Sequence, residues 1–203
     1  MLMTITPQPK ERPILFSAPM VRAILEGRKT VTRRACKPQP SANAHTTCAS
    51  GTPMGAWWET GKDIIRCPYG KPGDRLWVRE TWGLQVRNYG GGTGEHIVYR
   101  ATNPDAIYCK SAEGREYPVK WKPSIHMHRH SSRILLEITD VRVERLQDIS
   151  TEQIIAEGIS TALREHDAEV DLRRQWRDLW ESTGGDWQAN PWVWCVSFRR
   201  AEQ

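Results

Sequence analysis

Hydrophobic and polar positions follow two different periods along this chain of 203 residues, and each period predicts a different kind of element. Apolar side chains at every second position near the C-terminus predict a β-strand over 192–198. Its core face would carry Trp192, Trp194, Val196 and Phe198. Shorter apolar or alternating runs predict further extended segments at 13–16, 30–35, 76–78, 97–101 and 133–143.

Spacings of three to four residues between apolar positions predict helices. A short helix should follow Ser17 as its N-cap and end at Gly27, which can adopt the left-handed conformation of a C-terminal cap. Ser150 followed by Gln153 resembles a capping box, so a second short helix should run from residue 151 until Gly158 ends it.

A third and longer helix is expected over 165–181, where one apolar stripe faces charged positions. We interpret this stripe as a packing surface and not as part of a site. It consists of Ala168, Leu172, Trp176, Leu179 and Trp180.

The length suits one domain over 1–203 with insertions at about 38–70 and 84–130. The first insertion is rich in Pro, Ala, Ser, Thr and Gly and is expected to be a long loop. In the second, the glycine-rich segment 90–94 fits a flexible hairpin tip better than a phosphate-binding loop, because no Lys-Ser or Lys-Thr pair follows it.

Composition limits the cellular locations and the binding partners that we expect for this chain. No apolar run approaches the ~20 residues that a membrane span needs, and residues 1–13 lack the apolar centre of a signal peptide, so we expect a cytoplasmic protein without a membrane partner. Five cysteines without paired spacing favour reduced thiols. The net charge of +5 suits a polyanion such as RNA, and is modest enough to suit nucleosides.

The positive charge is concentrated between residues 22 and 37. Six basic residues there face one acidic residue, Glu26, which gives 6 − 1 = +5. Neighbouring cations disfavour an ammonium, so Lys29 should be easier to neutralise than in water and could accept the hydroxyl proton of Thr32. A solvated basic hairpin that holds phosphate is the alternative interpretation of the same residues.

The pattern Gly27, Lys29, Thr32 and Arg34 resembles the signature of the ASCH domain, Gly-x-Lys-x-x-(Glu or Thr)-x-Arg. The resemblance extends to 14–34, to 71–78 and to the closing strand at 192–198. It implies an α+β fold of PUA-like type, namely a mixed β-barrel with short flanking helices and, in this chain, a long inserted loop.

Threonine at the sixth position of the signature resembles the N4-acetylcytidine amidohydrolases. Their motif lysine and threonine act together with a glutamate in the short helix after a long barrel strand, and here the matching position is Glu157. The resemblance thus implies Lys29, Thr32 and Glu157 as catalytic residues and a nucleoside substrate, with no cofactor and no metal.

Larger members of the family, often encoded by phages and prophages, are similar to this chain around residues 77–82 and 123–127. The resemblance and the aromatic side chains suggest that Arg34 and four residues of the first of these segments bind substrate: Trp77, Arg79, Glu80 and Trp82. The chain departs from the family at 128–130, where His-Arg-His stands in place of an expected Pro-Arg-Trp.

The alternation of His126, His128 and His130 could suggest a metal site, but no cysteine or carboxylate lies within the same few residues, so a solvent-facing loop is the preferred interpretation. Two other functions stay open from the sequence: a non-catalytic RNA-binding module and a ribonuclease. Salt-sensitive binding that is indifferent to Thr32 would indicate the first, and cleaved RNA the second. A monomer or weak dimer is expected.

Overall fold

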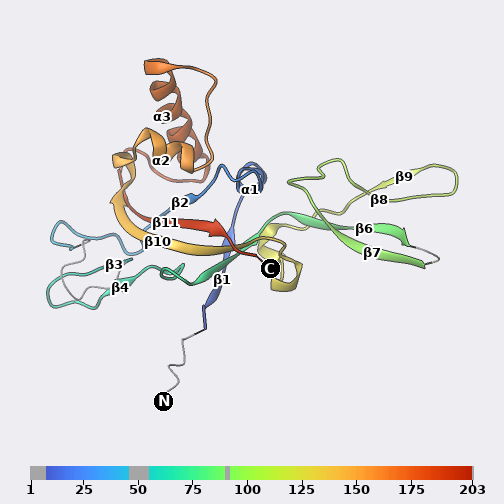
Figure 1. The fold of residues 1–203 in the computed structure, drawn as a ribbon, viewed down its shortest axis with the longest axis horizontal. Coiled ribbons are helices and arrows are strands. Elements are labelled where there is room, and N and C mark those ends of the chain that lie inside the picture. The colour runs from blue at the N-terminus through green and yellow to red at the C-terminus, as the bar shows by residue number, and fades with distance from the viewer. Residues whose placement is uncertain (1–7, 46–54, 90–91, 203) are drawn as a thin grey trace, which may run out of the picture.

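The structure is a computed structural model that describes residues 8–45, 55–89 and 92–202. A five-stranded mixed sheet with the order β1-β5-β10-β11-β2 lies at its centre (Figure 1). Its strands are β1 (Glu11–Leu15), β2 (Val31–Ala35), β5 (Arg75–Arg79), β10 (Leu135–Arg145) and β11 (Trp192–Arg200). β1 pairs with β5 in parallel, and the other pairs are antiparallel.

The predicted α+β class is confirmed, but the sheet is open where a closed barrel was expected. β10 pairs with β5 through its first residues and with β11 along its length, with an irregularity between Ile138 and Asp140. β1 and β2 are left at the two edges, and no strand pairing among the described residues joins them. The outer side of β2 is thereby free to border a site.

Three α-helices accompany the sheet in the described part of the chain, α1 (Ala18–Leu25), α2 (Thr151–Ala156) and α3 (Glu165–Ser182), close to the predicted ranges. Short 3₁₀ turns lie at Ser124–His126, Arg129–Ser131 and Leu146–Asp148. The capping box of α2 is present, with Ser150 and Gln153 exchanging hydrogen bonds. At α1, by contrast, the side chain of Ser17 makes no capping bond.

Strand β11 separates two hydrophobic clusters and is buried on both faces. Trp194, Val196 and Phe198 pack into the larger cluster with β5, β10 and α1, as the alternation predicts, and Trp192 is partly buried against it. The opposite face was not expected to be core, yet Val193 and Cys195 pack there against α2 and α3. Both helices are therefore fixed on the side of the sheet that carries β2 and β11.

The two insertions contain more structure than the sequence predicts. The first forms the short pair β3 (Ala56–Trp57) and β4 (Ile65–Arg66), while 46–54 lie outside the described residues. The second forms two hairpins that project from the sheet (Figure 1): β6 (Trp82–Tyr89) with β7 (Gly92–Tyr99), and β8 (Ile107–Lys110) with β9 (Glu116–Pro118). Of the predicted glycine-rich tip, 90–91 lie outside the described residues.

Strand β1 also begins at Glu11, two residues before the extended segment predicted at 13–16. In 8–45, 55–89 and 92–202, no helix is long and apolar enough to cross a membrane.

Candidate functional site

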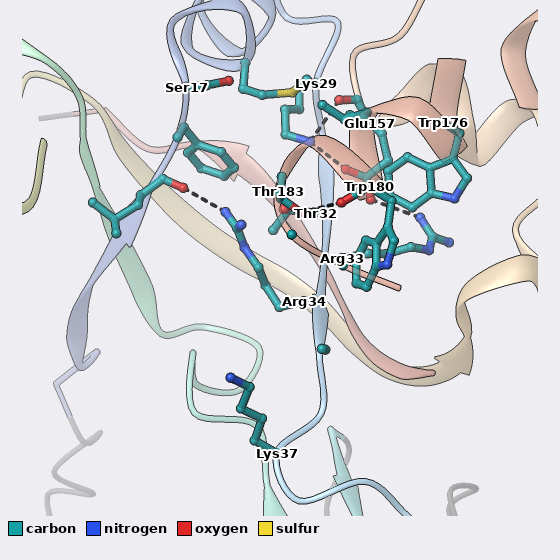
Figure 2. A pocket seen from close by; sticks show the side chains of 17 residues that line it. Ser17, Lys29, Thr32, Arg33, Arg34, Lys37, Glu157, Trp176, Trp180 and Thr183 are labelled. Atoms are coloured by element: carbon teal, nitrogen blue, oxygen red, sulfur yellow. Dashed lines mark hydrogen bonds and ion pairs between the residues drawn. The ribbon is translucent and has the colours of Figure 1, made fainter. Parts of the chain in front are cut away.

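A cavity of about 400 Å³ borders the edge strand β2, between the segment that leads into α1 and the C-terminal end of α3 (Figure 2). This volume falls within the usual range of small-molecule sites. Its polar lining includes Ser17, Lys29, Thr32, Arg33, Arg34, Lys37, Glu157 and Thr183, and its apolar lining includes Phe16, Met20, Trp176, Leu179 and Trp180. Lys29, Thr32, Glu157 and Arg34, all predicted as site residues, thus line one cavity.

Lys29 lies just before β2, in the turn that follows α1, and forms an isolated bridge with Glu157. A catalytic pairing with Thr32 requires this placement, because strand alternation from Lys29 onward would send the two side chains to opposite faces. The Lys29 side chain is only 2% exposed. Its Nζ donates to the Val31 carbonyl at 2.8 Å, the Glu157 carbonyl at 2.8 Å and Glu157 Oε2 at 2.6 Å. All three protons of an ammonium therefore have acceptors.

Glu157 is the C-cap residue of α2, and Gly158 follows it with φ of 91°, which ends the helix. A side chain at residue 158 would press on Lys29, since an added Cβ would lie 3.1 Å from the Cβ of Lys29. The carboxylate of Glu157 is 3% exposed and uses both oxygens, Oε2 toward Lys29 and Oε1 toward Arg33 Nη1 at 3.2 Å. The helix end thus presents Glu157 to two cations at once.

Arg33 extends this buried ionic network. Its Nη2 donates to Glu144 Oε2 at 3.1 Å and to Gln153 Oε1 at 3.0 Å. Gln153, which belongs to the capping box of α2, therefore also contacts the network. Two cations, Lys29 and Arg33, thus pair with two carboxylates, Glu157 and Glu144, and Glu144 also pairs with the exposed Arg142. The sequence indicates Arg33 only as one of six basic residues between 22 and 37, because its partners lie more than 100 residues away.

Burial lowers the pKa of Lys29 below its ordinary value of 10.5, and the positive charges of Arg34 and Arg33 lower it further. The carboxylate of Glu157 opposes both by its charge and its hydrogen bond, but desolvation is the larger effect. Arg28, another of the six basic residues between 22 and 37, is exposed and pairs with Glu26. The environment thus favours a neutral amine at Lys29 more than water does.

Thr32 lies in β2 opposite Val196 and is 3% exposed. Its residue lines the cavity, and within the described residues its hydroxyl forms no hydrogen bond. Strand pairing holds its backbone on one side only, because β2 is an edge strand. Thr32 and Lys29 thus line the same cavity, and the hydrogen bonds of Lys29 Nζ go to Val31 and Glu157 and not to this hydroxyl.

Arg34 follows on the same side of β2 and stacks on the ring of Phe16, with 5.4 Å from Cζ to the ring centroid. Its Nη2 donates to the Leu15 carbonyl at 2.7 Å, which fixes the plane of the guanidinium (Figure 2). Lys29 Nζ lies 5.6 Å from the centroid of the same ring. Phe16 thus supports two cations of the site, a function that the sequence did not indicate.

The apolar stripe of α3 is more than a packing surface, which corrects our interpretation of the sequence. Trp176, Leu179 and Trp180 pack into the smaller hydrophobic cluster and also form a wall of the cavity. After the helix, Gly185 lies against Trp180, where an added Cβ would be 2.2 Å from the indole Nε1. Helical periodicity identifies the buried stripe but cannot show that one end of it borders an opening.

The other four predicted substrate-binding residues do not line this cavity. Arg79 lies 5.5 Å from the ring centroid of Trp77 and donates to the carbonyls of Ser124 and Ile125. Glu80 is buried and forms a two-point ion pair with Arg133, at 2.9 and 3.0 Å.

Trp82, the last of the four, is buried under Lys122, whose Nζ lies 4.6 Å from the ring centroid. These contacts attach residues 122–133, which follow the projecting hairpins, to β5 and to the start of β6. In the described structure, the four residues are therefore placed to support the fold around β5.

The histidine-rich segment lies apart from the cavity. The rings of His128 and His130 stack with centroids 5.5 Å apart and planes 5° from parallel. Across the described residues, no group of three or more His, Cys, Asp or Glu side chains is arranged to hold a metal ion.

Comparison with known proteins leaves the family open. No family model matches the chain, and no curated protein matches it. Among solved structures, the chain is similar to a crystal structure of a protein from Enterococcus faecalis V583 described as DUF984, with 9% identity and a TM-score of 0.37. The match covers 97% of this chain and 82% of that one, and at this TM-score we draw no conclusion from it.

Proposed function

We propose that the chain is an ASCH-like amidohydrolase that removes the acetyl group, or a related acyl group, from N4-acetylcytidine. The observation that carries this proposal is the convergence of Lys29, Thr32 and Glu157 on one cavity, although 125 residues separate the last two. The ASCH signature predicts this meeting from sequence alone. Together the three side chains offer a hydroxyl, an amine of lowered pKa and a carboxylate.

The contact between Lys29 and Glu157 supports a base at this position. With three acceptors around Nζ, the ammonium form of Lys29 would donate to all of them and have no lone pair with which to accept a proton. The 2.6 Å contact offers its proton a direct path to Glu157 Oε2, which would leave a neutral amine next to a neutral acid. Because the pair is buried and coupled, its two protonation states must be considered together.

In the proposed reaction, neutral Lys29 takes the proton of the Thr32 hydroxyl as the oxygen attacks the acyl carbon. The carbon–nitrogen bond then breaks, the acyl group stays on Thr32 as an ester, and the leaving N4 of cytidine receives the proton from Lys29. Water then attacks the ester, which restores the hydroxyl and releases the carboxylic acid. Throughout the cycle, Glu157 keeps the proton that it accepted from the Lys29 ammonium before the first step, so Lys29 starts each step neutral.

The rest of the cavity lining is also suited to bind a nucleoside. Aromatic rings from two elements, Phe16 and the Trp176–Trp180 pair, border the space and can pack against a planar base. Arg34, fixed on Phe16, is placed to donate to a polar substrate atom. The substrate would thus lie between the segment before α1 and the end of α3.

The test is incubation of the purified protein with N4-acetylcytidine, with chromatographic separation of cytidine and acetate. We expect both products in equal amounts from the native chain. Thr32→Ala, Lys29→Ala and Glu157→Ala should each slow the reaction at least about a hundredfold, the usual minimum contribution of a positioned acid or base.

Thr183→Val is the matched control, since Thr183 lines the same cavity and donates its hydroxyl proton to the Trp180 carbonyl. It should stay within a few-fold of the native rate, which shows that loss of a cavity hydroxyl is not in itself harmful. Circular dichroism of each variant confirms folding. Persistent hydrolysis in folded Thr32→Ala would overturn the proposed nucleophile. Absence of hydrolysis in the native chain, with salt-sensitive RNA binding, would indicate a binding module instead.

A further inference from the structure

We infer that the substrate presents a phosphate group to Arg34 and Lys37 at the cavity, so that the physiological substrate is a nucleotide or an RNA residue and not a free nucleoside. This inference rests on the proposed function. It concerns the part of the cavity away from the Lys29–Glu157 pair (Figure 2).

The charges that line the cavity do not balance. Four cationic side chains face one carboxylate, and the four are Lys29, Arg33, Arg34 and Lys37. Glu157 is occupied by Lys29 and Arg33, and Glu144 supplies the second negative charge to Arg33. Among the described residues, Arg34 and Lys37 form no ion pair. The excess of positive charge is therefore confined to these two side chains.

Arg34 is held in position but retains donors. One Nη2 bond to the Leu15 carbonyl and the stacking on Phe16 fix its guanidinium, while its Nε is buried without a hydrogen-bond partner. A buried polar group without a partner is uncommon and is costly to the fold. Lys37 is exposed, and Figure 2 shows it extended on the same side of the cavity as Arg34, away from Glu157.

A phosphate would satisfy both cations, whereas a free nucleoside has no negative charge to offer them. An arginine with a fixed plane and a lysine that can move form a common pair for phosphate, the first by directed hydrogen bonds and the second as a point charge. With the acylated N4 atom at Thr32, the sugar and its phosphate can extend toward this pair. Free nucleotides and RNA share the chemistry, so the experiment must separate them.

The experiment compares kcat/KM of the native chain for N4-acetylcytidine, for its 5′- and 3′-monophosphates, and for a short oligoribonucleotide with one internal N4-acetylcytidine. We expect at least one phosphorylated substrate to exceed the nucleoside by about tenfold, the scale of one charged hydrogen bond. The advantage should shrink as salt is added. The better of the two phosphorylated classes then identifies the source of the phosphate.

Variants of Lys37 test whether the phosphate binds at this side chain. Lys37→Ala should lower the ratio of kcat/KM for the phosphorylated substrate to kcat/KM for the nucleoside to about one, and Lys37→Arg should keep most of this advantage. Lys71→Ala, a change at an exposed lysine that does not line the cavity, is the matched control and should behave like the native chain.

Equal kcat/KM for the nucleoside and all phosphorylated forms would overturn the inference and leave the amidohydrolase proposal intact. A phosphate advantage that survives in Lys37→Ala would overturn its placement at this lysine. Hydrolysis of none of the substrates would overturn the proposed function itself, and the inference with it.

Discussion

Lys29 Nζ lies 2.6 Å from Glu157 Oε2, and this contact joins two segments that are 128 residues apart in the sequence. It connects the turn before β2 to the end of α2, and both side chains are almost completely buried. A charged pair in such surroundings affects both the stability of the fold and the chemistry of the cavity.

Glu157→Gln should lower the free energy of unfolding by about 3 kcal/mol, because it leaves Lys29 and part of Arg33 buried without their carboxylate. Urea denaturation followed by circular dichroism measures the change. The double variant Lys29→Met with Glu157→Leu is the control and should lose less, since it removes both members of the buried pair. A double variant that is less stable than the single one would contradict this account.

The lowered pKa of Lys29 predicts a dependence of stability on pH. Between that lowered value and the ordinary 10.5, the unfolded chain holds a proton at Lys29 that the folded chain has released. The contribution of Lys29 to folding should therefore be least favourable below its folded pKa and should improve as the pH rises toward 10.5. The measurement is the difference in unfolding free energy between the native chain and Lys29→Met from about pH 7 upward. A difference that moves against the native chain as the pH rises would show that the pKa is not lowered.

Gly185→Ala should lower stability by roughly 1–3 kcal/mol and raise KM for N4-acetylcytidine, because an added Cβ would lie 2.2 Å from Trp180 Nε1 and would push the indole toward the cavity. Gly184→Ala is the comparison. Its Cβ would meet nothing within 4 Å, and its φ of +83° limits the cost to backbone strain of about 1 kcal/mol. Equal KM values in the two variants would show that Trp180 does not shape the binding space.

Glu80→Gln should lower the free energy of unfolding by about 3 kcal/mol, since it leaves the guanidinium of Arg133 next to a buried neutral amide. Glu137→Gln disrupts a similar two-point pair with Arg199 at the surface and should cost less than about 1 kcal/mol. Urea titration of both variants makes the comparison. Similar losses would mean that burial does not govern the strength of these pairs.

Local patterns in the sequence were sufficient to predict the elements that carry the residues of the site. The capping box at Ser150 places the start of α2, and the short helix that follows determines where Glu157 is presented. The signature around Lys29 and Thr32 indicates which segment borders the cavity. These features depend on neighbours in the chain, which is why they can be recognised without coordinates.

The remainder depends on contacts between distant segments. Nothing near Glu80 reveals that Arg133 neutralises it, so a structural ion pair resembles a substrate contact in the sequence. Trp176 and Trp180 follow a helical period whether their outer ends face protein or open space. Whether the sheet closes likewise depends on which strands pair, and among the described residues β1 and β2 do not pair with each other.

The proposed reactive groups and the apolar wall of the cavity come from separate segments. The former lie in and just before β2 and at the C-cap of α2, and the latter comes largely from α3. Substitutions along the last turn of α3 should therefore change which acyl groups of the proposed substrate fit, while the proposed reactive side chains stay unaltered. A combinatorial library at 176, 179 and 180 would be a direct route to variants with new selectivity for the proposed reaction.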